Sequence, residues 1–515
     1  MPEYLHPGVY VEEIERGPKP IEGVPTSTAA FIGETERGPT KPRLVTSYKD
    51  YVRWFGGVFS DTKFMPYAVN GFFENGGKRL YVCRVTDDAA TPAQAAFGAS
   101  FIVRAAGPGL WGKRIYAKVD DSTTLKPGPN NTMVPVGFML RFAYYATPPT
   151  GNPLDWFNNA TKPPFPSAAE IFDDLDMDEQ SPNYWYKRVH GNSALADLVS
   201  TGQGTAPPAK QFAQLATNGA DGAASLDVAD FEGRVQLPQR ATEQGLAALE
   251  LDPYREVALV YAPGGPVAVN KAVITHCEKL KYRFAVVDAE KAVDVTNFQP
   301  RSAIQDTKYA ALYYPWIAIS DPATGARKEV PPGGHVLGVY ARTDSERGVF
   351  KAPANEILRG VLELTADIND STQDDLNPRG INAVRQFPER GIRVWGARTL
   401  TSDALWKYVS VRRLFIFLER SIYEGTQWVV FEPNDDRLWA RVIDTIRLFL
   451  RTQWRLGALF GRTEQESFFI TCDRTTMTQD DILNGRLICE IGIAPVRPAE
   501  FVIFRIFQHT AEAQN

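Results

Sequence analysis

The middle of the chain alternates short apolar runs with amphipathic stretches, a pattern that is typical of strands joined by helices. The apolar runs at residues 29–32, 257–261 and 284–287 predict β-strands. The stretches at residues 67–74 and 268–281 have the spacing and end signals of helices. We therefore expect a mixed α/β fold (α+β in its overall make-up) with a βαβ-like core.

The C-terminal part of the chain has the most regular pattern. One apolar helix is expected over residues 403–423, with Ser402 as its N-cap, and a second over residues 435–456. Strands are predicted at residues 468–471, 487–493 and 501–507.

The second of these helices has two unlike faces. Apolar side chains at helical spacing form one face, and five arginines with Asp444 as the only acid among them form the other. Arginines one turn apart repel each other by a few tenths of a kcal/mol, so a merely solvated face would be more stable with both signs of charge. A solvated face is the plain interpretation, and contact with a partner is the alternative. The arginines are Arg437, Arg441, Arg447, Arg451 and Arg455.

The strand predicted near the C-terminus is apolar on both faces except at Arg505. Such a strand needs cover on both sides, although chain ends are usually exposed. It is either a central strand of its own domain or a strand given to a neighbouring subunit, and we expect the exchange. Its residues are Phe501, Val502, Ile503, Phe504, Arg505, Ile506 and Phe507.

Residues 1–24 are expected to form an arm, because a short β-favouring run is flanked by glycines and prolines and is too small to build a core. We expect this run also to add to a neighbour as a strand. It consists of Val9, Tyr10, Val11, Glu12, Glu13 and Ile14. Residues 91–235 are rich in proline and acidic residues, which predicts an inserted, surface-facing module of short strands and long loops.

Length, net charge, cysteine content and apolar runs exclude some classes of function. The 515 residues suggest about three domains. A formal net charge of -5 argues against binding nucleic acid over the whole surface. Four cysteines far apart predict reduced thiols in a protein that folds in a cytosol. The N-terminus lacks the pattern of a signal peptide, and no apolar run reaches the roughly 18 residues of a membrane helix.

Residues 107–114 nearly match a phosphate-binding loop. Arg114 stands where that motif needs a hydroxyl, Pro108 has no N–H to offer, and a strand rather than a helix is predicted to follow. A tight glycine turn between strands is the better interpretation.

Two further features have plain structural interpretations. The loop at Ala262–Gly265 follows a buried strand, where α/β sheets often bind ligands, but it lacks the dinucleotide fingerprint. His276, Cys277 and Glu278 are adjacent on a predicted helix and therefore point in different directions. No histidines have metal-ligand spacing, and we expect no catalytic residue, cofactor or metal.

Several sequence segments in the chain are typical of one protein family. The chain resembles the contractile tail sheath proteins of bacteriophages and of phage-tail-like injection particles, over about residues 1–85 and 220–515. The resemblance is weak over residues 91–235. The segments that carry the resemblance lie at residues 1–13, 219–222, 309–316, 348–355, 380–385, 391–399, 411–421, 428–434, 472–484 and 489–504.

The resemblance implies a multidomain sheath fold with inner α/β domains, an inserted β-rich outer domain and terminal arms. The expected segments are a linking arm (1–24), a middle domain (25–90 with 236–375), the outer domain (91–235), an inner tube-facing domain (376–499) and a terminal strand (500–515). The Arg face would then point toward the tube.

The resemblance also implies a function without catalysis. The chain would polymerise with itself in stacked hexameric rings around an inner tube protein, meet baseplate and cap proteins, and contract to drive the tube through an envelope. Assembly in the bacterial cytoplasm is expected, without direct nucleic-acid binding or membrane insertion. Two alternatives stay open: an α/β enzyme with a crevice near Ala262–Gly265, and a sheath paralogue limited to the baseplate or cap end.

Overall fold

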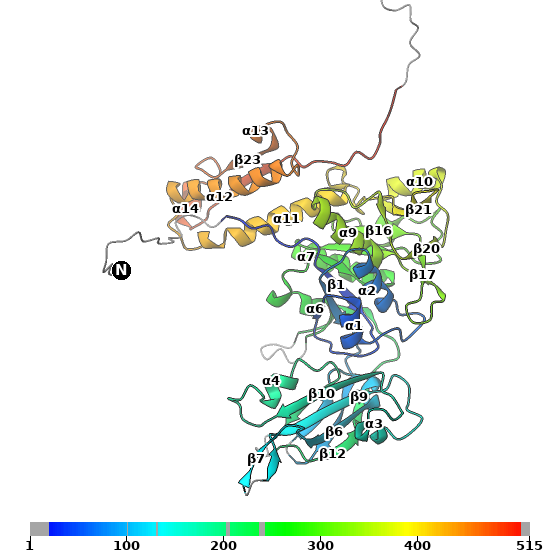
Figure 1. Cartoon of the computed structure of the whole chain (residues 1–515). Coiled ribbons are helices and arrows are strands. Elements are labelled where there is room, and N and C mark those ends of the chain that lie inside the picture. Colours follow the sequence, from blue (N-terminus) through cyan, green and yellow to red (C-terminus); the bar gives the residue numbers. More distant parts are fainter. Residues whose placement is uncertain (1–19, 100, 130–131, 202–206, 236–242, 506–515) are drawn as a thin grey trace, which may run out of the picture. The chain divides into compact units, whose positions relative to one another are not determined.

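The computed structural model describes residues 20–99, 101–129, 132–201, 207–235 and 243–505 (Figure 1). The chain divides into two compact units. The larger unit runs from Pro25 to Arg413, and the smaller unit combines residues 1–24 with residues 414–515. The division falls inside helix α11 (Val409–Gly425).

The larger unit is built on a nine-stranded sheet with the order β19-β22-β21-β16-β15-β14-β1-β3-β2. The six neighbouring strands from β3 to β21 run parallel, and the outer strands pair antiparallel. Every residue of β1 and β15 is buried, as expected for parallel strands covered on both faces. The strands are β1 (Ala29–Gly33), β2 (Arg43–Val45), β3 (Leu80–Arg84), β14 (Leu259–Tyr261), β15 (Phe284–Asp288), β16 (Ala310–Tyr314), β19 (Glu356–Ile357), β21 (Ile381–Phe387) and β22 (Gly391–Val394).

Helices cover this sheet, and two of them approach each other closely. A Cβ atom on Gly334 of α9 would lie 2.5 Å from the Ala68 backbone of α2, so only glycine permits this packing. The helix predicted over residues 268–281 is confirmed as α7. The helices of this region are α1 (Tyr48–Phe55), α2 (Met65–Glu74), α6 (Gly245–Leu249), α7 (Val267–Leu280), α8 (Pro300–Ala303), α9 (Gly333–Arg347) and α10 (Asp370–Leu376). A separate three-stranded sheet consists of β17 (Ile317–Ser320), β18 (Arg327–Val330) and β20 (Val361–Leu364).

Residues 91–220 of the same unit form a β-sandwich. Two four-stranded antiparallel sheets, β10-β9-β6-β12 and β11-β5-β4-β13, share one buried cluster that includes Phe97, Val103, Ile115 and Phe142. The elements of this region are β4 (Thr91–Phe97), β5 (Phe101–Ala105), β6 (Ile115–Asp121), β7 (Leu125–Pro127), β8 (Met133–Pro135), β9 (Phe138–Tyr144), α3 (Leu154–Asn158), β10 (Ala168–Leu175), α4 (Trp185–Val189), β11 (Ala196–Ser200), β12 (Gln211–Gln214) and β13 (Thr217–Ala220). Helix α5 (Val228–Glu232) follows the sandwich and packs on α6 and α7.

The smaller unit contains the C-terminal part of α11 and a second long helix, α12 (Asp436–Arg455), which lie side by side (Figure 1). Residues 20–24 pack on α11: the Val24 amide donates to Ser421 Oγ at 3.2 Å, and Gly23 lies against Phe417. A two-stranded antiparallel sheet joins β23 to β24. The remaining elements are α13 (Glu464–Ser467), β23 (Phe468–Thr471), α14 (Gln479–Leu483) and β24 (Glu490–Ile493).

The structure differs from the expectation at the first C-terminal helix, which begins at Val409 rather than Asp403. Asp403 instead caps a single 3-10 turn by accepting from the Leu405 amide. The chain then pairs back on itself, because the Val409 amide donates to Ala397 O at 3.0 Å. A further difference is that residues 381–394, expected in the C-terminal domain, belong to the nine-stranded sheet. The other expected domain boundaries stay predictions.

Candidate assembly surfaces

Helix α12 presents the arginine face. Asp435 caps the helix by accepting from the Leu438 amide at 2.9 Å, as its type and position predict. The opposite, apolar face packs inward, with Trp439, Ile446 and Leu450 buried. The sequence therefore placed the helix and its two faces correctly.

The arginine face is less free of acids than its sequence suggests. Arg451 Nε donates to Glu464 Oε2 at 2.6 Å. This bond lowers the pKa of Glu464 and outweighs burial, which acts in the opposite direction. Arg447 lies between Glu464, at 3.8 Å, and Asp444, at 3.1 Å. Glu464 belongs to α13, the next helix along the chain, so the pattern of residues within α12 could not reveal this ion pair. Part of the positive charge on this face is therefore balanced within the subunit.

The other three arginines form fewer or longer ion pairs. Arg437 and Arg455 are exposed and have no ion-pair partner among the described residues. Arg441 stacks over the Trp428 ring, with 4.5 Å between its guanidinium carbon and the ring centroid, and reaches Glu432 only at 3.6 Å. These guanidiniums have spare hydrogen-bond donors for an acidic partner.

The C-terminal apolar run is exposed. Phe501, Val502, Ile503 and Phe504 expose 71, 67, 79 and 84% of their surface, and residues 501–505 form no strand. Four consecutive large apolar residues in water are unusual, which makes this segment a candidate for an interaction surface. The rest of the predicted strand, Ile506 and Phe507, and the whole N-terminal run from Val9 to Ile14 lie outside the described residues, so strand exchange stays a prediction.

The smaller unit also contains a sheet with two open edges. Strands β23 and β24 pair only with each other among the described residues, in the register Phe468↔Ile493 to Thr471↔Glu490. A two-stranded sheet is marginal by itself, and each of its edges presents unpaired N–H and C=O groups. It is therefore suited to accept strands from elsewhere.

Exposed apolar side chains concentrate in this unit. Of the 23 large apolar residues that are exposed in the described part of the chain, 13 lie between Tyr423 and Phe504. Phe431 is fully exposed at 103% and has a left-handed backbone, with φ of 69°. Non-glycine residues rarely hold such a conformation unless it has a use.

Amides of the loop that resembles a phosphate site are already bonded within the protein. The Leu110 amide donates to the Asp221 carboxylate at 2.7 Å, and the Gly109 amide donates to Thr91 O at 3.0 Å. A Cβ atom on Gly107 would lie 2.0 Å from Gly38 O, so this glycine serves a close backbone approach. The residues that follow form β6, as expected.

The loop after β14 is bonded to a buried carboxylate. Asp288 accepts hydrogen bonds from Tyr261 Oη at 2.5 Å and from the Gly333 amide at 2.9 Å. The Gly264 amide also bonds to this carboxylate, while burial raises its pKa to about 7. Asp288 thus joins the loop at Ala262–Gly265 to the start of α9.

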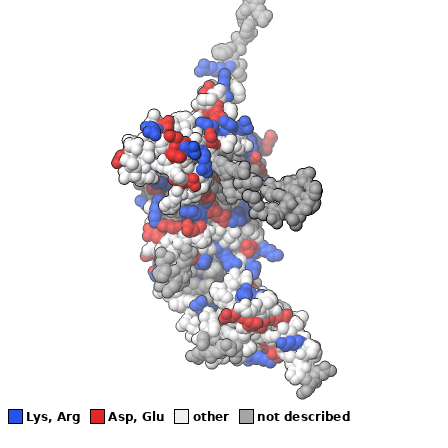
Figure 2. All heavy atoms as spheres, turned by 90° about the vertical axis from the view of Figure 1, so that its left-hand side faces the viewer, with Lys and Arg blue, Asp and Glu red and all other residues white. Residues whose placement is uncertain are grey.

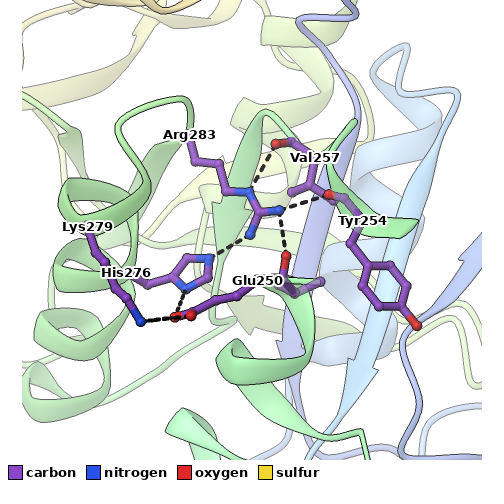
Figure 3. A network of polar contacts seen from close by, with 7 residues as sticks. Glu250, Tyr254, Val257, His276, Lys279 and Arg283 are labelled. Carbon is purple, nitrogen blue, oxygen red and sulfur yellow. Dashed lines mark hydrogen bonds and ion pairs between the residues drawn. The ribbon is translucent and has the colours of Figure 1, made fainter. Parts of the chain in front are cut away.

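His276 belongs to a buried network that holds helix α7 (Figure 3). Its Nε2 atom lies 2.7 Å from the Arg283 guanidinium, which also donates to the carbonyl oxygens of Leu249, Tyr254 and Val257. Burial, followed by the nearby Arg283 charge, lowers the pKa of His276 to about 3, so its ring is neutral and accepts a hydrogen bond. Among the described residues no group of three His, Cys, Asp or Glu side chains could hold a metal ion.

The surface charge is mixed. On the face shown in Figure 2, basic and acidic side chains are intermingled, without a broad area of one sign. Within the described part of the chain, no helix combines the length and apolar character needed to cross a membrane.

Comparison with family models decides the relationship. The model described as the phage tail sheath protein central domain matches residues 239–400, and the model described as the phage tail sheath C-terminal domain matches residues 401–509. The chain belongs to the phage tail sheath family. The resemblance read from the sequence is thus confirmed, and the two matches meet where the nine-stranded sheet gives way to the C-terminal helices.

Individual sheath proteins are distant in sequence. The tail sheath protein of Burkholderia phage BcepMu is 24% identical over 484 residues, covering 89% of this chain and 88% of the relative. A prophage tail sheath relative in Pseudomonas aeruginosa is 25% identical over 256 residues, and the match spans 64% of its length. The match to the tail sheath protein of Vibrio phage KVP40 spans 40% of that relative.

Solved sheath structures share the fold along nearly the whole chain. The helical sheath of the anti-feeding prophage in its contracted state matches 98% of this chain, with a TM-score of 0.58 and 24% identity. The sheath tail protein of Listeria innocua matches 93%, with a TM-score of 0.57 and 12% identity. The expected mixed α/β sheath fold is therefore confirmed.

Proposed function

We propose that this chain is the structural subunit of a contractile sheath, which polymerises as stacked hexameric rings around an inner tube and shortens to drive that tube through a target envelope. The observation that carries this proposal is the pair of consecutive sheath-family matches over residues 239–509, on a fold that aligns with sheath subunits along 98% of the chain. The subunit acts without catalysis or cofactor. It assembles in the bacterial cytoplasm and also meets baseplate and cap proteins.

Electron microscopy of the purified full-length chain tests this function. Tubular polymers of stacked rings are the expected product, since self-association is the defining activity of a sheath subunit. A chain that stays monomeric at high concentration would overturn the proposal. Isolated rings that never stack would favour a paralogue limited to the baseplate, a second candidate that draws support from the fold match to the baseplate of the anti-feeding prophage (TM-score 0.56).

The terminal segments link the subunits in this proposal. An extended strand from one subunit adds to the open edge of β23 or β24 in another, which pairs the backbone groups that both edges leave exposed. Exposure of Phe501–Phe504 supports this role, because a strand of the subunit's own core would bury these side chains. The sandwich within residues 91–235 forms the outer surface of the assembled sheath in this proposal. Its sequence resembles sheath proteins only weakly, in keeping with this position.

The arginine face of α12 contacts the inner tube in this proposal. Each exposed ion pair contributes only about 0–1 kcal/mol. Repetition over many subunits makes the sum large, because each bound subunit holds its neighbours near their own sites. Arg437 and Arg441 carry the contact, since Arg437 is exposed without an ion pair among the described residues and Arg441 has only a long one.

Reversing these two charges is expected to weaken association with the tube and to leave the subunit folded. Residue 437 lies in the first turn of α12, where an acidic side chain is favourable, so Arg437→Glu should keep the melting temperature. Arg441→Glu gives up the Trp428 and Glu432 contacts, which are exposed, so it should lower the melting temperature only slightly. Co-sedimentation with tube protein at several salt concentrations measures the effect. The control Lys49→Glu with Lys126→Glu changes the net charge equally at exposed sites elsewhere. Equal co-sedimentation of both variants at physiological salt would show that the face does not bind the tube.

A further inference from the structure

The two cysteines of the smaller unit face each other across the β23–β24 sheet. The antiparallel register ends at Thr471↔Glu490, so the next pair outward is Cys472 and Cys489. Each of the two thiols influences the pKa of the other, which places them close together. Cys472 is buried, and Cys489 is partly accessible. No other cysteine is near in sequence, and Cys83 and Cys277 lie buried in the larger unit.

The geometry suits a disulfide. Residues directly opposite on antiparallel strands have Cα atoms about 4.5 or 5.5 Å apart, depending on the type of pair. A disulfide joins Cα atoms about 4.4–6.8 Å apart, so either type of pair can be bridged with little backbone movement. We propose that Cys472 and Cys489 form an intramolecular disulfide when the protein meets a disulfide oxidant, and that this bond closes the hairpin between β23 and β24.

The reaction balances as a thiol–disulfide exchange with a small disulfide such as oxidised glutathione. The Cys489 thiolate attacks one sulfur of the oxidant, which breaks the S–S bond and releases one glutathione thiolate. The Cys472 thiolate then attacks Cys489 Sγ, forms the protein disulfide and releases the second glutathione. Both cysteines lose their protons to solvent, and the pair transfers two electrons to the oxidant. Cys489 reacts first because it is the accessible partner.

The surroundings of the pair should make its oxidation slow. Burial, followed by the neighbouring Cys472, raises the pKa of Cys489 to about 12, and burial also raises the pKa of Cys472. Only the thiolate attacks a disulfide. While the pH is below these pKa values, the rate of oxidation should therefore rise about tenfold for each unit by which the pH is raised. A cytosol rich in reduced glutathione would leave both thiols free, whereas release into an oxidising medium would close the bond.

The closed bond should stiffen a weak element. The loop between the two cysteines contains α14 and the turns around it, and β23–β24 is a two-stranded sheet. Cross-linking a loop of this length restricts the unfolded chain and so favours the folded hairpin. The edges that accept added strands in the proposed assembly would be more ordered after oxidation.

The test treats the purified full-length protein with oxidised glutathione at pH 8 to 9, blocks free thiols in denaturant, and maps the peptides by mass spectrometry. The expected product has a Cys472–Cys489 bridge and blocked Cys83 and Cys277, and dithiothreitol reverses it. The reaction should be roughly tenfold slower at one pH unit lower. Limited proteolysis between residues 472 and 489 should slow after oxidation in the native chain but not in Cys472→Ser or Cys489→Ser.

Four results would overturn the proposal. They are four free thiols after prolonged oxidation, glutathione retained on Cys489, disulfide-linked dimers on a non-reducing gel, and a bridge that leaves the proteolysis rate unchanged. The double variant Cys472→Ser with Cys489→Ser keeps the hydrogen-bonding character of the pair. It serves as the folded reference that cannot be oxidised at this position.

Discussion

Deleting residues 501–515 is expected to abolish tube formation while the subunit stays soluble and folded. The described part of this segment, Phe501–Arg505, forms no strand and leaves its apolar side chains in water, so the subunit gains little stability from it. In the proposed assembly the same side chains become buried against a neighbour. The deletion should therefore act on the polymer and not on the monomer.

The expected effect is large because several terms act together. Burying a Phe, Ile or Val side chain contributes roughly 1.5–3 kcal/mol. Each strand hydrogen bond adds a net amount of about 0.5–1.5 kcal/mol. Ordering costs about 1–2 kcal/mol per residue, so the apolar side chains decide the balance. Electron microscopy and sedimentation velocity measure the polymer, and a thermal melt checks the monomer.

The matched control deletes residues 508–515, which lie beyond the predicted strand, and should still form tubes. A second variant that lacks residues 1–16 should give weaker or shorter tubes, because the run from Val9 to Ile14 has fewer apolar side chains. Insolubility of the 501–515 deletion would mean that the strand completes its own core. Tubes of normal length from either deletion would show that the deleted segment does not link subunits.

The sequence predicted the elements whose signals are local. Helix α12 combines a 3.6-residue apolar period with an Asp435 cap, and both belong to the helix itself, so the prediction missed its ends by only one residue. The parallel strands β14 and β15 were found because complete burial makes them continuously apolar. In each case the residues that carry the signal are the residues that form the element.

The errors arose where distant residues decide the structure. Ser402 was expected to cap a long helix that begins at Asp403, but the segments around Ala397 and Val409 pair with each other, and Asp403 caps only one 3-10 turn. The carboxylate that pairs with Arg451 comes from Glu464, 13 residues further along the chain. Neither relation has a periodicity, so composition and spacing could not reveal them. The arginine face thus appeared more unbalanced in the sequence than it is in the fold.

The candidate site was predictable only in part for a related reason. The apolar character of Phe501–Phe504 was visible in the sequence, but the surface on which an exchanged strand would pair was not. The β23–β24 edges became candidates only once the structure gave their register and showed no third described strand beside them. A sheet edge depends on which strands pair, and no local pattern of residues reports that pairing.

Breaking the Arg413–Asp344 pair is expected to destabilise the larger unit more than any surface substitution. The two side chains expose only 3 and 5% of their surface, and Arg413 Nη1 donates to Asp344 Oδ1 at 2.9 Å. Thr26 Oγ1 also donates to this carboxylate at 2.7 Å, and Thr26 O accepts from Arg413 at 3.0 Å. The pair therefore joins the start of the domain, helix α9 and the first turns of α11.

Removing one partner leaves the other charge buried without compensation, which costs about 3–5 kcal/mol. Arg413→Ala should therefore lower the melting temperature of the larger unit by several degrees and reduce the yield of folded protein.

The informative control is Arg413→Met with Asp344→Leu, which removes both charges and keeps most of the volume. This double variant should recover much of the lost stability, because a well-packed apolar pair can equal a buried ion pair. Surface variants such as Lys49→Glu should stay within about 0.5 kcal/mol of the parent. If Arg413→Ala melts at the parent temperature, water reaches the Asp344 carboxylate and the pair is not buried in solution. If the double variant is no more stable than the single one, the cost arises from the arginine's packing over the Tyr340 ring, 4.9 Å from its guanidinium carbon, and not from the unpaired charge.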